Sequence, residues 1–134
     1  LYLFENSDEQ VIKDASEFWK LIAGQDWLAI SEMIDTICAI NNDNLYEKMF
    51  LHIMRLLRNA FFRNIEGTEN YIMGEGTPEF PLQGVRTPER AGELIDLCER
   101  SIGYLRARAG VALVFAEFAI SVMEIFNGKK CQIG

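Results

Sequence analysis

The sequence predicts an all-α fold: a single five-helix, bundle-like domain whose last helix is apolar and central. Apolar residues recur at helical spacing in five segments, and no segment alternates with period two as a half-buried strand would. In the last segment, residues 111–126, the only polar side chains are Glu117, Ser121 and Glu124, which share one stripe of a helix. A helix that is apolar on nearly every face is either buried by several neighbours or lies in lipid. Two glutamates, and a length below the roughly 20 residues of a membrane span, favour burial, so we expect no membrane contact.

The first two predicted helices cover residues 7–24 and 26–40. Ser7 begins a capping-box pattern, and Gly24 is a typical residue at a C-terminal stop. Asp26 is of the type that caps a helix N-terminus. One stripe of the second helix is expected to face the core: Trp27, Ile30, Ile34 and Ile37.

The third predicted helix covers residues 44–65, with Asn44 as its cap in a second capping box. Four glycines and two prolines then interrupt any period over residues 67–86. This segment is predicted to be a long irregular loop, and such loops inside small domains are often functional.

The fourth predicted helix begins with Thr87-Pro88-Glu89, where threonine caps, proline takes the first helical position and the acid meets the positive end of the helix dipole. It is expected to end near Arg108. Gly110 separates it from the last helix, and residues 129–134 are predicted to form a frayed tail.

Composition and charge favour protein partners over nucleic acid. The net charge is −7, and residues 1–50 hold ten acidic and three basic side chains, whereas residues 51–134 hold ten of each. Binding to phosphates requires clustered Lys and Arg, so we expect no direct DNA binding. The chain of 134 residues fits one domain, starts without methionine and shows no signal peptide. It is expected to be a piece of a longer protein.

Metal, cofactor and small-molecule sites are not expected. His52 is the only histidine, no glutamate precedes it by three residues, and a structural role on its helix is the more common one. The cysteines lack metal-ligand spacing and are interpreted as small core residues in a reducing compartment. They are Cys38, Cys98 and Cys131.

The sequence also offers no strong candidate for a catalytic group. The carboxylate pairs Glu32 with Asp35 and Glu93 with Asp96 would act in acid–base catalysis only inside a pocket, and on amphipathic helices such pairs are usually solvated. The glycine-rich stretch 74–77 lacks the lysine of a phosphate-binding loop. The sequence therefore predicts a domain without catalytic residues.

Four arginines are the candidate functional residues. Arg55 and Arg58 are three residues apart on an otherwise apolar helix, and Arg106 and Arg108 lie near the end of the fourth helix. The simpler interpretation is that they complement helix dipoles and form salt bridges with the acidic helices. The functional interpretation is a subunit interface, because arginine beside apolar residues is enriched there.

The order of these segments resembles a known family. Residues 51–61 resemble the leucine-rich helix of bacterial clamp-loader subunits, which carries an Arg-Asn or Arg-Asp pair. Residues 94–108, the break, and the apolar helix 111–120 with its early Glu117 are similar to the end of those proteins, and residues 26–40 fit the preceding helix. The chain thus resembles the C-terminal collar domain of a DNA polymerase III clamp-loader subunit, delta-prime or else gamma/tau.

The resemblance implies that the chain is the C-terminal piece of a longer cytoplasmic protein. It implies a helical collar that binds the other clamp-loader subunits in a ring during DNA replication and has no catalysis of its own. Two alternatives stay open. One is a helical protein-interaction adaptor, and the other is a ligand-binding helical bundle, which would require a pocket lined by convergent polar groups.

Overall fold

The computed structural model describes the backbone of residues 2–65 and 88–127, and the side chains of residues 9–59 and 89–127. Over this part of the chain there are five helices and no strand, which confirms the predicted all-α, bundle-like fold class. The helices are α1 (Tyr2–Gly24), α2 (Trp27–Ile40), α3 (Asp43–Ile65), α4 (Pro88–Arg106) and α5 (Val111–Phe126).

Most helix boundaries agree with the sequence. α3 ends at Ile65 and α4 begins at Pro88, as predicted. Asp26 caps α2, because its Oδ1 accepts the backbone N–H of Ala29 at 3.3 Å. The predicted loop 67–86, the predicted tail 129–134 and the cap Thr87 lie outside the described residues.

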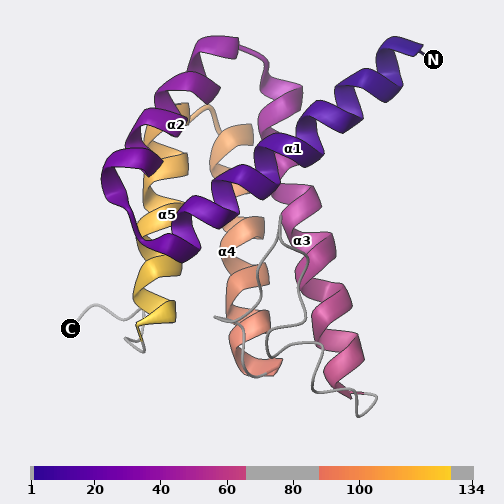
Figure 1. Ribbon diagram of the computed structural model, residues 1–134, viewed down its shortest axis with the longest axis vertical. Coiled ribbons are helices and arrows are strands. Elements are labelled where there is room, and N and C mark those ends of the chain that lie inside the picture. Colours follow the sequence, from indigo (N-terminus) through magenta and orange to yellow (C-terminus); the bar gives the residue numbers. More distant parts are fainter. Residues whose placement is uncertain (1, 66–87, 128–134) are drawn as a thin grey trace.

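All five helices contribute to one core. α3 packs against α1 and α4, while α5 packs against α1, α2 and α4. In Figure 1, α4 lies between α3 and α5, and α1 crosses the other helices obliquely. Because α1 touches both α3 and α5, it closes the side of the bundle that lies opposite α4.

Aromatic rings fill the centre of this bundle. The ring of Phe50 on α3 stacks on Phe115 of α5 at 4.8 Å and meets Phe118 edge-on at 5.0 Å. Phe18 of α1 contacts the same two rings at 5.4 and 6.3 Å. Each such pair contributes about 0.5–1.5 kcal/mol beyond the area that it buries. The rings therefore join α1, α3 and α5 across the core.

Two predicted helix starts are wrong. α1 begins at Tyr2, so Ser7 lies inside the helix and does not cap it. The residues before Ser7 include no glycine or proline, and a capping box contributes only about 1 kcal/mol, too little to end a helix there. The cap of α3 is Asn42 and not Asn44, since Asn42 Oδ1 accepts the N–H groups of Asn44 and Leu45 at 3.1 and 3.3 Å.

One prediction about side-chain direction also fails. Trp27 stands at the first turn of α2 and is exposed, while Ile30, Ile34 and Ile37 are buried. Ser121 on α5 is buried, although Glu117 of the same polar stripe is exposed. The described helices include none with the length and apolar character of a bilayer crossing.

Candidate interaction surface

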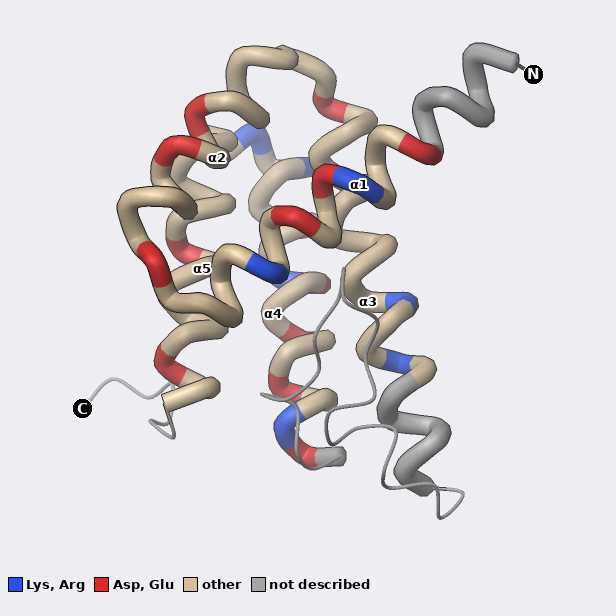
Figure 2. The backbone as a smooth tube through the Cα atoms, viewed as in Figure 1, with Lys and Arg blue, Asp and Glu red and all other residues tan. Residues whose placement is uncertain are grey.

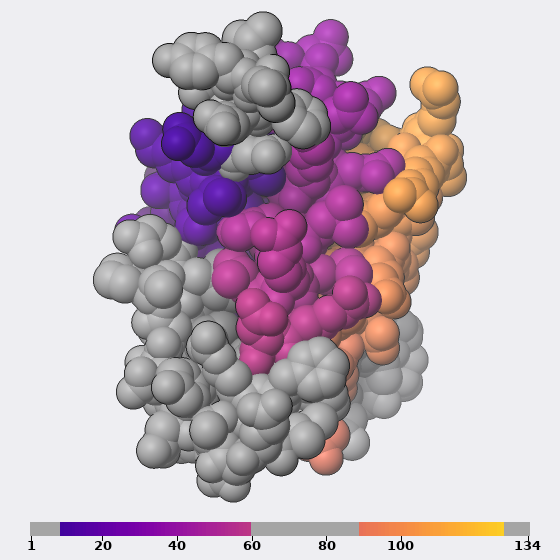
Figure 3. Space-filling model, turned by 90° about the vertical axis from the view of Figure 1, so that its right-hand side faces the viewer, coloured from indigo at the N-terminus to yellow at the C-terminus, as the bar shows by residue number. Residues whose placement is uncertain are grey.

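The candidate arginines do not form one patch. Arg106 on α4 makes a two-pronged contact with Glu47 of α3, in which Nε and a terminal guanidinium nitrogen each donate to a carboxylate oxygen at 3.1 Å. Arg58 of α3 lies 3.7 Å from the carboxylate of Glu99 on α4. The two pairs stand at different heights of the α3–α4 seam, and Figure 3 shows these helices side by side on one face.

Electrostatics agree with an internal role for Arg106. The hydrogen bonds from Arg106 lower the pKa of the Glu47 carboxyl, and the same pair raises the pKa of the guanidinium. Forked arginine–carboxylate contacts are geometrically specific. The pair is solvated, so it orients α3 against α4 more than it stabilises the fold.

Arg108 has a different structural setting. It follows the end of α4 with φ of 69°, a left-handed conformation that residues with a side chain rarely adopt. The backbone N–H of Arg108 donates to the carbonyl of Leu105, and the N–H of Ala109 donates to the carbonyl of Tyr104. These two hydrogen bonds form a Schellman motif at the end of α4. A polar recess of about 360 Å³ lies beside it. The recess is lined by Asp43, Tyr46, Glu47, Leu105, Arg106, Arg108, Ala109 and Val111.

The remaining titratable groups are not gathered into a site. Burial, and then the charge of Arg55, lower the pKa of the half-buried His52. Burial raises the pKa of Cys98 strongly and that of Cys38 less, so both thiols are held in their unreactive protonated forms. Over the described residues, no set of His, Cys, Asp and Glu is grouped so that it could hold a metal ion.

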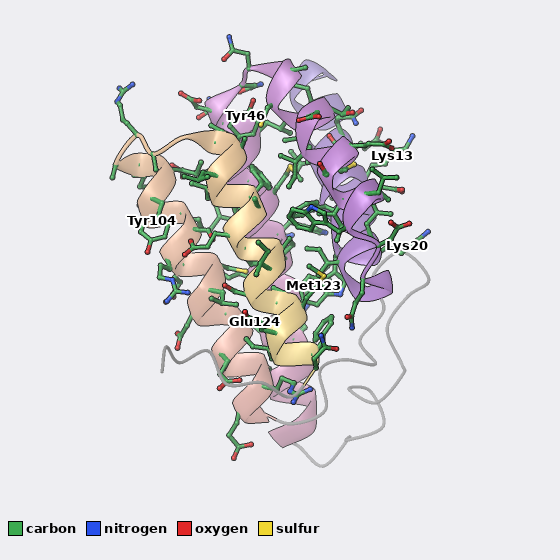
Figure 4. The ribbon with its side chains drawn as sticks, turned by 90° about the vertical axis from the view of Figure 1, so that its left-hand side faces the viewer. Lys13, Lys20, Tyr46, Tyr104, Met123 and Glu124 are labelled. Carbon is green, nitrogen blue, oxygen red and sulfur yellow. The ribbon has the colours of Figure 1, made fainter. Side chains whose placement is uncertain are left out.

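An apolar groove lies between α4 and α5. Leu113 and Ile120 on α5 are 73% and 44% exposed, and Tyr104 of α4 is 39% exposed beside them. The groove has a volume of about 480 Å³ and includes Glu117 between the two aliphatic side chains. Figure 4 views this face, with Tyr104 on α4 and Glu124 further along α5. We call Leu113, Glu117, Ile120 and Glu124 the α5 stripe, in which the first three residues are exposed and Glu124 is half-buried.

Comparison with protein-family models, characterised proteins and solved structures finds no match for this chain. The functional argument therefore depends on the surfaces described above. Among them, the groove brings together exposed apolar side chains from two helices. Single exposed apolar residues elsewhere, such as Ile12 on α1 and Leu51 on α3, are common on protein surfaces.

The groove residues were not singled out from the sequence, although a signal was present. Leu113, Glu117, Ile120 and Glu124 recur at i, i+4, i+7 and i+11, which is as regular as the predicted polar stripe. The two stripes share both glutamates and differ by a rotation of the helix. Only the packing of α5 shows that Ile120 faces solvent and Ser121 faces the core.

Proposed function

We propose that this chain is a helical assembly domain without catalytic function, which joins a partner protein through the α4–α5 groove. The observation that carries the proposal is the exposure of Tyr104, Leu113 and Ile120 around one groove. Contiguous exposed apolar surface on a small domain marks sites that a partner covers.

The groove has the composition of an interface centre. Interfaces contain aromatic and aliphatic side chains at the centre and polar groups at the rim, and a standard one buries about 800 Å² per partner. Tyr104 has an apolar ring and a hydroxyl that can bind a polar partner group. Glu117 supplies a charged group in the groove, and Arg100 is exposed one helical turn from Tyr104 on α4.

The resemblance to clamp-loader subunits gives this proposal a specific form. In that form the chain is the collar domain of a delta-prime or gamma/tau subunit of DNA polymerase III, and the partners are its neighbours in the clamp loader. The all-α fold and an apolar C-terminal helix with an exposed stripe are compatible with that role.

Co-purification tests both levels of the proposal. The chain, within the longest natural protein that contains it, is co-expressed with the clamp-loader subunits of its own organism and purified at moderate salt. We expect the wild type to enter the complex. The double variant Leu113→Ser/Ile120→Ser is expected to lower recovery at least about tenfold, because each change removes apolar area from the interface centre.

Leu28→Ser is the matched control, because Leu28 on α2 is 69% exposed and lies away from the groove. It should leave recovery unchanged, and both variants should retain the wild-type melting temperature. If the wild type never joins those subunits, the clamp-loader form of the proposal is wrong and the adaptor alternative is preferred.

The candidate arginines require a separate variant. Arg58 and Arg106 contact Glu99 and Glu47, so reversing their charge would also remove contacts within the domain. Arg108 is exposed at the α4–α5 turn, and Arg108→Glu is the cleaner test of an arginine-bearing interface. Recovery of the complex should fall while the domain stays folded.

A further inference from the structure

Charge along the groove changes from one end to the other. At the α4–α5 turn the groove is lined by Tyr104, Ala109 and Leu113. Further from the turn the α5 stripe carries the exposed Glu117 and then the half-buried Glu124, while α5 contains no basic residue. α2, which packs against α5, also contains no basic residue. Figure 2 shows red but no blue segments on these two helices.

The α4 side of the groove continues the gradient. Glu93, Arg100 and Tyr104 are exposed and are spaced by seven and four residues, so they lie along one side of α4. Glu99 and Arg106, which contact α3, project from the other side. Since α4 and α5 run antiparallel from their short turn, Glu93 and Glu124 both lie beyond the far end of the groove, which reaches Ile120 on α5. Two basic residues of α4, Arg90 and Arg100, lie three and seven residues from Glu93, and neither lines the groove itself.

We propose that the groove binds an amphipathic helix of the partner, which places apolar residues against Leu113, Ile120 and Tyr104 and Lys or Arg against Glu117 and Glu124. This names the partner chemistry of the site under the proposed function and rests on that function. The α5 stripe from Leu113 to Glu124 rises over about 16 Å, which three turns of a partner helix would match.

Two other occupants are disfavoured by charge. An acidic helix would place carboxylates against Glu117 and Glu124, and like charges brought together at an interface oppose binding. A second copy of this chain that docked α5 against α5 would bring the same glutamates together. A basic helix gains attraction at the far end of the groove and apolar contact at the turn.

The test uses the full chain, labelled with ¹⁵N, and two synthetic 18-residue amphipathic peptides. Both peptides carry leucine at i, i+4, i+7 and i+11, and they differ only in having lysine or glutamate at the flanking positions. We expect the lysine peptide to shift amide resonances of α4 and α5 and the glutamate peptide to bind at least about tenfold more weakly. Binding of the lysine peptide should weaken as salt rises.

Charge variants distinguish the effect of glutamates beside the groove on peptide binding from the effect of the overall negative charge. Glu117→Lys/Glu124→Lys should weaken the binding of the lysine peptide at least about tenfold. Glu32→Lys/Asp35→Lys makes the same change in net charge on exposed residues of α2 and should weaken it by less than about threefold. Equal losses in both variants, equal binding of both peptides, or resonance shifts confined to other helices would each overturn the proposal.

The same variants distinguish this inference from the proposed function. If the complex forms and is sensitive to Leu113→Ser/Ile120→Ser but not to Glu117→Lys/Glu124→Lys, the assembly function holds and the basic-helix inference is wrong. If the lysine peptide binds in the groove but no clamp-loader subunit co-purifies, the inference holds and the clamp-loader assignment is wrong.

Discussion

At the scale of single residues, His52 reports its surroundings directly because it is the only histidine of the chain. It is half-buried on α3, and burial and the nearby Arg55 both disfavour its charged form. Its pKa in the folded protein is therefore below the ordinary 6.5. As pH falls from above 6.5 through the lowered pKa, the unfolded chain gains a proton that the folded chain resists, so folding is destabilised over that range.

We predict that an NMR titration of the His52 ring gives a pKa below 6.5, and that Arg55→Gln raises it while Arg58→Gln does not. Arg58 is the matched control because it contacts Glu99 and does not contribute to the shift. His52→Gln should flatten the stability curve between neutral and mildly acidic pH. A pKa at or above 6.5 would show that the ring is solvated.

Arg108 is the second residue whose local state makes a measurable prediction. The left-handed conformation costs a residue with a Cβ about 1–2 kcal/mol, and glycine avoids this cost at the expense of a more flexible unfolded chain. Arg108→Gly should therefore stabilise the protein by about 0.5–1 kcal/mol in urea melts. Asn41→Gly, at the left-handed end of α2, should change stability less because asparagine tolerates this region. A loss of stability in Arg108→Gly would mean that the guanidinium makes a stabilising contact.

At the scale of elements, α5 is held by one buried face. Phe118 is 1% exposed and its ring contacts Phe18 and Phe50 from two other helices. Phe118→Ala should cost about 3–5 kcal/mol of unfolding free energy, because it leaves a cavity at the point where three helices meet. Leu113→Ala on the outer face of the same helix should cost less than about 0.5 kcal/mol. Urea melts that give a loss under about 1 kcal/mol for Phe118→Ala would contradict this packing of α5.

Helix ends in this protein are set by backbone hydrogen bonds and by side chains from neighbouring elements. The hydroxyl of Tyr46 on α3 donates to the carbonyls of Ile37 and Cys38, which lie at the end of α2. The carbonyl of Cys38 also accepts the backbone N–H of Asn41 at 3.2 Å, so the tyrosine adds to the backbone bond that ends α2. The corner between α2 and α3 is thus held by a buried tyrosine that also meets the ring of Phe115.

At the scale of the whole molecule, charge decides which partners are available. The chain carries −7, and Arg58 and Arg106 are paired with carboxylates on the molecule itself. We predict no salt-dependent binding of duplex or single-stranded DNA, measured by fluorescence anisotropy of labelled oligonucleotides at 50 and 200 mM salt. Counterion release makes real phosphate contacts steeply salt-dependent. Tight binding at the lower salt that disappears at the higher salt would contradict the prediction.

The sequence by itself determined the fold class and most of the helix boundaries. Pro88, Asp26 and Gly110 act within a few residues of the chain, through a fixed φ, a side-chain cap and a break in the apolar pattern. Apolar spacing also identified most of the core, since the 3.6-residue period is a local property. The errors at Ser7 and Asn44 occurred because a helix cap contributes only about 1 kcal/mol. That is too little to stop α1 from extending past Ser7, and it does not distinguish Asn42 from Asn44 as the cap of α3.

The tertiary structure alone decided which faces the helices turn outward. The two candidate stripes of α5 share both glutamates, and one of them adds Leu113 and Ile120 where the other adds Ser121. The packing of Phe115 and Phe118 against α1 and α3 selected between them. The same holds for Arg106 and Glu47, which are far apart in sequence and meet because α3 and α4 pack together. Helical periodicity defines the angle between residues on one helix, whereas the rotation of that helix is set by contacts with distant segments, and the groove depends on this rotation.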